Sequence, residues 1–207
     1  MSVELVLATG NRKKIAELAP ALEVLGVRVL AGDAAGVLPE VTEDRPSFAG
    51  NAEKKAIAAA SATGRWALAD DSGLEVDALE GAPGVASARF AGRHGDDAAN
   101  NALLLERLAG LSAAKRGARF VCALALARPD CTLEGIFEGT ARGRILEAPR
   151  GGRDFGYDPL FLFTEEGFAA SGHAFAELEP RLKAEVSHRG RALARLIHHL
   201  SQLGLAG

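Results

Sequence analysis

The stretch Trp66-Ala67-Leu68-Ala69-Asp70-Asp71-Ser72-Gly73 places two adjacent carboxylates at the end of an apolar run. The apolar residues predict a buried strand over residues 66–69, and Ser72-Gly73 permits the backbone to turn sharply after it. Neighbouring side chains of a strand point to opposite faces, so Asp70 and Asp71 converge only where the chain leaves strand geometry.

This stretch alone leaves two interpretations of the acidic pair open. In the first, a hard divalent cation such as Mg²⁺ keeps both carboxylates ionised, because two unneutralised carboxylates held close would raise the pKa of one of them. In the second, the pair is a solvated acidic turn. The choice between them depends on the rest of the chain.

The chain before this stretch predicts a strand, a loop and two helices. Residues 3–8 are apolar enough for a buried strand, and a helix with apolar residues at helical spacing follows Thr9-Gly10-Asn11. Residues 26–47 read as irregular, with a short strand at 27–30. An Ala-rich helix over residues 48–62 is expected to stop at Gly64.

The chain after it predicts a helix, several strands and two closing helices. The helix begins near Asp96-Asp97. Residues 119–127 predict a strand buried on both faces, and strands at 132–140 and around 144–146 would follow it in a meander. A strand at 160–163, a short helix at 181–185 and a longer helix from Ser187 complete the chain, which gives an α/β fold.

Composition indicates ordinary globular material, either one domain or two intimate lobes. The 207 residues are 48% hydrophobic and 25% charged, with a net charge of −3. That charge gives no reason to expect nucleic-acid binding, although small anions remain possible ligands. Cys122 and Cys131 are the two cysteines, and we expect them to be reduced in a cytoplasmic protein. No apolar run is long enough to predict a membrane span or a signal peptide.

Basic residues open two of the predicted helices, where the helix macrodipole disfavours cations by roughly 0.3–1 kcal/mol each. Arg12, Lys13 and Lys14 begin the first helix, and His188 and Arg189 begin the last. Either the side chains extend into water, or an anion binds to them and to the free N–H groups. A polyphosphate with Mg²⁺ would account for both helix starts and for the acidic pair. No Walker A or G-x-G-x-x-G pattern follows the first strand.

Six ordered motifs resemble the inosine triphosphate pyrophosphatase family. They are Thr9-Gly10-Asn11-x-x-Lys14, Phe48-x-x-Asn51-Ala52-x-x-Lys55-Ala56, Ala69-Asp70-Asp71-Ser72-Gly73, Gly81-Ala82-Pro83-Gly84-x-x-Ser87-Ala88-Arg89, Phe155-Gly156-Tyr157-Asp158-Pro159 and Ser187-His188-Arg189-Gly190. The resemblance covers nearly the whole chain. It implies an elongated mixed β-sheet flanked by helices, a single domain over residues 1–207 with a cleft between two lobes, and usually a homodimer.

The resemblance also implies an activity and a role for each matching residue. The activity is Mg²⁺-dependent hydrolysis of deaminated purine nucleoside triphosphates (ITP, dITP and XTP) to the monophosphate and pyrophosphate, which cleanses the nucleotide pool. Asp71 would be the general base, and Glu43, Asp70 and Asp71 would hold Mg²⁺. The residues implied in substrate binding are Thr9, Gly10, Asn11, Lys14 and Lys55 for the triphosphate, Ser72, Phe155 as the ring that stacks on the purine, Gly156, Tyr157 and Asp158 beside it, and Lys183, His188 and Arg189 for the keto edge of the base.

Some positions depart from the family pattern or leave alternatives open. Gly50 stands where relatives often carry Glu, so a possible outer partner of the metal is missing. Glu43 is placed only by its distance from Phe48, and Glu40 or Asp44 could take its part. Tyr157, like Phe155, could be a packing residue instead of a ligand. Two other functions are weighed: a nucleotide sensor that does not hydrolyse, and a different Mg²⁺-dependent phosphohydrolase.

Overall fold

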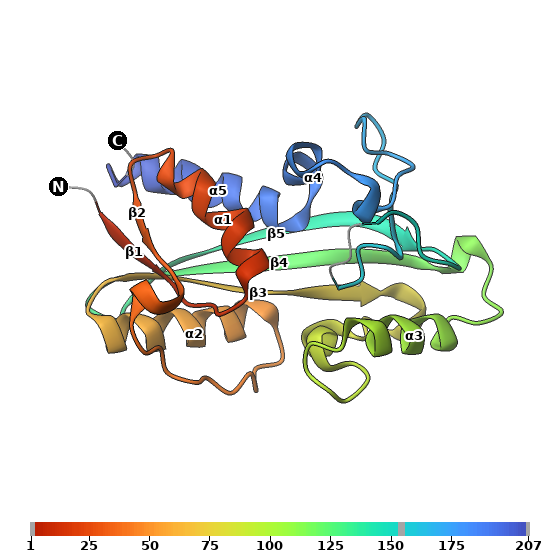
Figure 1. Ribbon diagram of the computed structural model, residues 1–207, viewed down its shortest axis with the longest axis horizontal. Helices are drawn as coiled ribbons and strands as arrows, with labels where there is room; N and C mark the ends of the chain where they lie inside the picture. The colour runs from red at the N-terminus through yellow and green to blue at the C-terminus, as the bar shows by residue number, and fades with distance from the viewer. Residues whose placement is uncertain (1–2, 153–155, 206–207) are drawn as a thin grey trace. The chain divides into compact units, whose positions relative to one another are not determined.

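The computed structural model describes residues 3–152 and 156–205 of the chain. Its strands are β1 (Glu4–Leu7), β2 (Arg28–Leu30), β3 (Trp66–Val76), β4 (Gly117–Ala127), β5 (Leu133–Ile145) and β6 (Phe161–Phe163). Its α-helices are α1 (Arg12–Glu23), α2 (Phe48–Thr63), α3 (Asp97–Arg107), α4 (Pro180–Val186) and α5 (His188–Gln202). Figure 1 labels these elements except β6, and short 3₁₀ turns join several of them.

The six strands form one mixed sheet in the order β2-β1-β3-β4-β5-β6. Strand β1 runs parallel to β2 and to β3, whereas β5 and β6 are antiparallel. The parallel part needs crossover connections, which α1 and α2 provide, and the later strands follow one another along the sheet. The predicted α/β fold, a mixed sheet flanked by helices, is confirmed.

Contacts divide the chain into two compact units. The first unit comprises residues 1–71, 122–139 and 190–207, and the second comprises residues 72–121 and 140–189. The divisions fall inside β3, β4, β5 and at the start of α5, so each of these elements contributes residues to both units.

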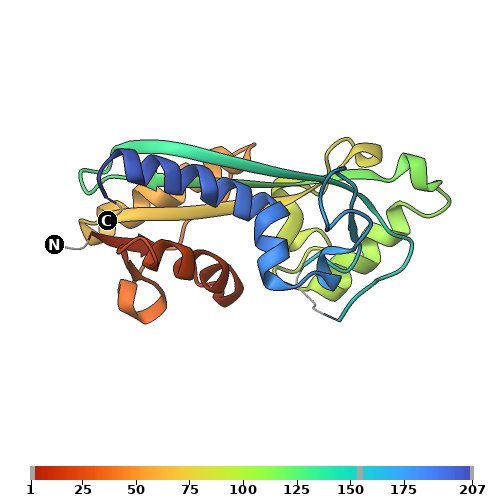
Figure 2. The same ribbon diagram turned by 90° about the horizontal axis from the view of Figure 1, so that it is seen from above.

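Helices cover both faces of the sheet in the first unit. Helices α1 and α5 lie on one face and α2 lies on the other (Figure 1). Leu18 and Leu22 of α1 share a buried cluster with Cys122 and Leu124 of β4 and with Leu196 of α5. Figure 2 shows α5 lying along the strands, where Arg195 Nη1 donates to the Glu138 carbonyl at 2.8 Å. Apolar burial on both faces explains why residues 120–127 of β4 are all apolar.

The second unit has its own core, which aromatic rings dominate. The Phe120 ring lies 4.7 Å from Phe161 and 5.7 Å from Phe175, measured between ring centroids. Arg116 is buried beside this core and donates to the carbonyls of Leu108, Ile145 and Leu146, each at 2.8 Å. Helix α3 lies on one side of the strands and α4 on the other (Figure 1).

Two predicted strand boundaries are wrong. The strand predicted to end at residue 69 continues to Val76 as β3, without the turn that Ser72-Gly73 permits, because Leu74 and Val76 are fully buried and hold the strand in the core of the second unit. The strands expected at 132–140 and near 144–146 are one strand, β5. Gly143 lies where an added Cβ would come within 2.3 Å of the Leu162 carbonyl oxygen, so the glycine there serves close strand pairing with β6.

The helix boundaries follow their capping residues. Ser47 Oγ accepts from the Gly50 N–H at 3.1 Å and begins α2, and Gly64, with φ of 63°, ends it. Asp96 caps α3 through the Ala99 N–H.

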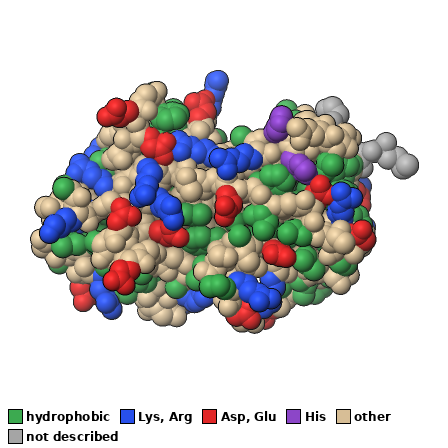
Figure 3. Space-filling view, turned by 180° about the vertical axis from the view of Figure 1, so that it is seen from behind, with side chains coloured by type: hydrophobic (Ala, Val, Ile, Leu, Met, Phe, Trp, Pro, Cys, Tyr) green, Lys and Arg blue, Asp and Glu red, His purple; other side chains and the backbone are tan. Residues whose placement is uncertain are grey.

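No helix of residues 3–152 or 156–205 combines the length and the hydrophobicity that a membrane crossing requires. Acidic and basic side chains are intermixed on the face that Figure 3 shows.

Candidate active site

Asp70 and Asp71 point to opposite faces of β3. Asp70 accepts from Lys14 of α1, whereas Asp71 accepts from Lys55 of α2, at 2.9 Å from Nζ to Oδ1. Helices α1 and α2 cover opposite faces of the sheet, so the alternation of the strand gives each carboxylate a different lysine. Both aspartates are buried, and this excludes the solvated acidic turn.

Asp71 lies in a buried cluster of polar side chains from α2 and the loop before it. We call Glu43, Asn51, Lys55 and Asp71 the carboxylate cluster. Besides Lys55, Asp71 contacts Asn51, whose Nδ2 donates to Asp71 Oδ2 at 3.2 Å. Burial, joined by the nearby negative charge of Glu43, raises the pKa of Asp71 although Lys55 opposes the shift. A carboxylate with a raised pKa suits proton transfer near neutral pH.

Lys55 donates to three oxygens, two from the carboxylate cluster and one from the backbone of Asp70. Its Nζ donates to Glu43 Oε1 at 2.8 Å, to the Asp70 carbonyl at 2.9 Å and to Asp71 Oδ1 at 2.9 Å. Burial would lower the pKa of Lys55, but the charges of Asp71 and Glu43 outweigh it, so the pKa is raised and the ammonium stays charged. Among the three acidic residues of this loop that the sequence left open, Glu43 is the one that contacts Lys55. Asp44 instead pairs with Lys54, and Glu40 is exposed.

Asp70 has protein partners on both carboxylate oxygens. Oδ1 accepts from Lys14 Nζ, and Oδ2 accepts from the thiol of Cys122 on the neighbouring strand β4 at 3.3 Å. The side chain is only 1% exposed. Within the described residues, no three or more His, Cys, Asp or Glu side chains form a group that could hold a metal ion. The predicted metal role of Asp70 would therefore require exchange of one of its protein partners.

The loop after β1 is arranged around the start of α1. Asn11 Oδ1 accepts from the N–H groups of Lys13 and Lys14 at 3.0 and 3.3 Å, and Thr9 Oγ1 accepts from the Asn11 N–H at 3.1 Å. A Cβ added to Gly10 would meet no atom within 4 Å, so the protein leaves open space there. The structure thus brings Lys14 and this loop to the same helix end, as predicted, and gives Asn11 a capping role that the sequence did not reveal.

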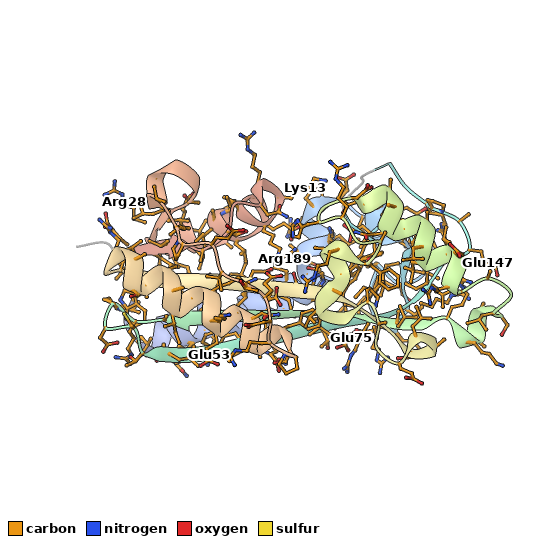
Figure 4. All side chains as sticks on the ribbon, turned by 90° about the horizontal axis from the view of Figure 1, so that it is seen from below. Lys13, Arg28, Glu53, Glu75, Glu147 and Arg189 are labelled. Carbon is orange, nitrogen blue, oxygen red and sulfur yellow. The ribbon has the colours of Figure 1, made fainter. Side chains whose placement is uncertain are left out.

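The predicted base-reading residues that lie in the second unit are mostly buried. Arg189, labelled in Figure 4, donates from Nη2 to Ser72 Oγ at 2.9 Å. The His188 ring stacks on Phe120 with centroids 4.6 Å apart. Lys183 Nζ pairs with Asp158 Oδ2.

Tyr157 belongs to the core of the second unit. Its side chain is 4% exposed, and its hydroxyl donates to the Ser87 carbonyl at 2.9 Å. Burial also raises the pKa of Tyr157. The ring of Tyr157 is therefore a packing residue of this core. Phe155, the predicted stacking ring, lies outside the described residues.

Helix α3 holds the backbone of Gly156 from both sides. The Gly156 N–H donates to Asp97 Oδ2 at 2.9 Å, and the Gly156 carbonyl accepts from Asn101 Nδ2 at 2.9 Å. Asp97 and Asn101 are one turn apart, so they lie on the same face of α3. The sequence analysis did not select them, because nothing in the sequence relates α3 to a loop more than fifty residues later. Asn51 and Cys122 were also missed, although Asn51 lies one turn from Lys55.

A family model agrees with this arrangement. The model described as the Ham1 family matches residues 5–199. The chain belongs to the Ham1 family.

Relatives of this Ham1 chain carry one name. A dITP/XTP pyrophosphatase from Desulforamulus reducens is 50% identical over 202 residues, which cover 97% of each chain. One from Geobacter sulfurreducens is 47% identical over 201 residues, which cover 97% of this chain and 98% of the relative. These relatives confirm the resemblance to pyrophosphatases of deaminated purine nucleotides.

Solved structures of Ham1 proteins share the fold. A HAM1 protein from Coxiella burnetii has a TM-score of 0.85 at 38% identity and covers 97% of this chain and 99% of its own. A nucleoside-triphosphatase / dITP/XTP pyrophosphatase from Mycobacterium abscessus has a TM-score of 0.75 at 46% identity, with 94% and 99% covered.

Proposed function

We propose that this Ham1 protein hydrolyses deaminated purine nucleoside triphosphates, dITP, ITP and XTP, to the monophosphate and pyrophosphate. The observation that carries the proposal is Asp71, a buried carboxylate with a raised pKa that accepts from both Lys55 and Asn51. Relatives that are up to 50% identical over 97% of the chain and named for this activity support it.

In the proposed mechanism, Asp71 is the general base. It takes a proton from the water that attacks the α-phosphorus, and its raised pKa makes it a stronger base than an ordinary carboxylate. Lys55, which keeps its charge, stabilises the ionised carboxylate before the step. Thr9, Gly10, Asn11 and Lys14 bind the triphosphate at the start of α1, where N–H groups and a lysine meet an anion. The positive charge of Lys14 then favours departure of pyrophosphate.

The donor chemistry of the carboxylate cluster fits a divalent cation. Glu43 and Asp71 supply ionised oxygens within reach of one ammonium group, and hard oxygen ligands are those that Mg²⁺ prefers. We propose that Glu43 and Asp71 hold Mg²⁺, together with Asp70 if Lys14 exchanges onto the phosphates. Bound there, Mg²⁺ would neutralise charge on the triphosphate.

Base recognition is assigned to residues of the second unit. Phe155 stacks on the purine, the backbone of Gly156, Tyr157 and Asp158 borders it, and Lys183, His188 and Arg189 donate to its keto edge, while Ser72 also contacts the substrate. Adenine presents an amine at the 6 position, so ATP lacks the acceptor that a keto oxygen offers to these donors. A hydrogen bond that a buried donor makes with ITP and not with ATP favours the deaminated purine.

The remaining proposals concern the protein as a whole. The two units form one inosine triphosphate pyrophosphatase-like domain over residues 1–207, and two copies assemble as a homodimer in the cytoplasm. The sizes of oligomers in solution, measured by light scattering, test the dimer.

One assay tests the activity. The protein is incubated with ITP, XTP, ATP and GTP, with and without Mg²⁺, and the released phosphate is identified. We expect pyrophosphate from ITP and XTP only, and only with Mg²⁺. Orthophosphate, or equal turnover of ATP and ITP, would indicate the other phosphohydrolase; tight ITP binding without turnover would indicate the sensor.

A further inference from the structure

Asn51 has no role in the proposed mechanism, yet its side chain joins two parts of the carboxylate cluster. It is fully buried in α2. Its Oδ1 accepts from the backbone N–H of Arg45 at 3.0 Å, and its Nδ2 donates to Asp71 Oδ2 at 3.2 Å. One amide group therefore touches both the proposed base and the loop that carries Glu43.

The two contacts demand opposite chemistry from the same side chain. The Arg45 N–H needs an acceptor and the Asp71 carboxylate needs a donor, and an amide supplies both. Aspartate at position 51 would keep the acceptor but turn an oxygen toward Asp71. Leucine, of similar size, would leave both buried groups unsatisfied.

Two donors of α2 define the orientation of the Asp71 carboxylate. Lys55 bonds Oδ1 and Asn51 bonds Oδ2, and the two residues lie one turn apart on the same helix face. With both oxygens bonded, rotation of the carboxylate about its last bond would break a contact. A general base gains rate only when its oxygen is held in the direction of the proton it takes.

The same face of α2 also fixes the loop before it. Lys54 Nζ donates to the Thr42 carbonyl and to Asp44 Oδ1, each at 2.9 Å, and Lys55 contacts Glu43. Asn51 adds the contact to Arg45. Helix α2 thus holds both the loop before it and Asp71, and Asn51 contacts both of them through its rigid amide group.

We propose that Asn51 is a positioning residue that orients the Asp71 carboxylate and couples it to the loop segment Thr42–Arg45. This inference rests on the proposed function, because it assigns Asn51 to the orientation of the proposed base. It predicts that loss of the donor alone reduces the rate of the chemical step while substrate binding is retained.

The test compares Asn51→Asp with a matched change elsewhere, Asn100→Asp. Asn100 is also buried, accepts from the Ala91 N–H at 2.8 Å and donates to the Ala88 carbonyl, but it has no contact with the carboxylate cluster. With dITP and Mg²⁺, we expect Asn51→Asp to lower kcat by about 10- to 100-fold with KM within about threefold. Asn100→Asp should leave both constants near wild type among the molecules that remain folded.

Hydrogen exchange of the Arg45 N–H tests the contact of Asn51 with the loop separately from its contact with Asp71. The Arg45 amide should stay protected in Asn51→Asp, which keeps the acceptor, and should lose protection in Asn51→Leu. If Asn51→Asp does not fold, Asn51→Ser, which removes both contacts, takes its place with the same expected loss of kcat.

Three outcomes would overturn the inference. Wild-type kcat in a folded Asn51→Asp or Asn51→Ser, or an equal loss in Asn100→Asp, would overturn it while pyrophosphate release by the wild type still upheld the function. No pyrophosphate release by the wild type would overturn the function and, with it, the inference.

Discussion

Asp70 and Asp71 show how one chemical group acquires two behaviours from its position on a strand. Both are carboxylates on consecutive residues and both are buried, yet Asp70 is paired with Lys14 and a thiol, whereas Asp71 faces Lys55, Asn51 and the negative charge of Glu43. The strand alternation alone assigns these partners, because it sends the two side chains to opposite faces.

The Asp71→Asn variant tests the role of Asp71 in activity and in stability together. We expect turnover of dITP to fall by about 10²- to 10⁴-fold, the range for loss of a general base. The variant should remain folded by circular dichroism, since asparagine keeps the shape and an acceptor for Lys55. Unchanged kinetics would exclude Asp71 as the base.

The difference in stability between the wild type and Asp71→Asn, measured without metal, has a predicted pH dependence. The folded pKa of Asp71 is raised above its ordinary value of 3.8, so the folded state binds this proton more tightly than the unfolded state. The stability contribution of Asp71 is therefore fully present below pH 3.8 and is lost as the pH rises through the folded pKa. A tenfold difference in proton affinity corresponds to about 1.4 kcal/mol.

Urea unfolding across the acidic pH range measures this difference. The free energy of unfolding of the wild type, minus that of Asp71→Asn, should fall as the pH rises from 3.8, because asparagine has no proton to lose. A difference that rises with pH would mean that Lys55 outweighs burial and that the pKa is lowered.

Sequence patterns predicted the participants of the carboxylate cluster better than their partners. The family resemblance implied Asp71, Lys55 and Glu43 as members of one site, with Glu40 and Asp44 left open as alternatives to Glu43. The resemblance could not show that Cys122 bonds Asp70 or that Asn51 bonds Asp71, because those contacts depend on which strand face meets which helix. Tyr157, for which packing was an open alternative, buries its ring in the core of the second unit.

At the scale of elements, α3 acts as a support for the backbone of Gly156. Asp97 and Asn101 hold the N–H and the carbonyl of Gly156, which is next in sequence to the proposed stacking residue Phe155. A fixed Gly156 backbone would reduce the entropy lost when a purine binds beside it.

Asp97→Ala should therefore raise KM for dITP by about tenfold while kcat changes little, because the support concerns binding and not the chemical step. Asp96→Ala is the matched control, since Asp96 caps the same helix through the Ala99 N–H and does not contact Gly156. The control should cost about 1 kcal/mol of stability and leave KM unchanged. An equal rise of KM in both variants would assign the effect to the helix as a whole.

Element types were predictable and some element ends were not. The predicted stop of α2 at Gly64 and the predicted start of α3 near Asp96-Asp97 are confirmed, because Gly64 and Asp96 act through contacts within a few residues. The ends of β3 and β5 were missed because Ser72-Gly73 permits a turn without requiring one. Burial of Leu74 and Val76 in the second core decides the matter, and that burial is a property of the folded chain.

At the scale of the whole molecule, the chain passes repeatedly from one unit to the other within single elements. Strands β3, β4 and β5 each extend through a division, and none of the divisions is a flexible linker. Unfolding of one unit would break the strands of the other, so the units should lose structure together.

The single Trp and the single Tyr of the chain allow this to be measured. Trp66 belongs to the first unit and Tyr157 to the core of the second. Urea transitions followed by Trp fluorescence and by Tyr absorbance should share one midpoint and one slope. Midpoints that differ beyond error would mean two separately folding domains, contrary to the proposed single domain.

The uninterrupted strand β3 has a last consequence, for the kinds of mutation the site tolerates. Lysines lie on both faces of the sheet, so the alternation of side chains along β3 decides which lysine each of the two acidic residues contacts. A substitution at Asp70 or at Asp71 alters the contacts on one face of the sheet and leaves the contacts on the other face intact. Deletion of one residue between Trp66 and Asp70 would shift the strand by one residue. Asp71 would then face Lys14, and Ser72 would face Lys55. In evolution, β3 should accept substitutions far more readily than insertions or deletions.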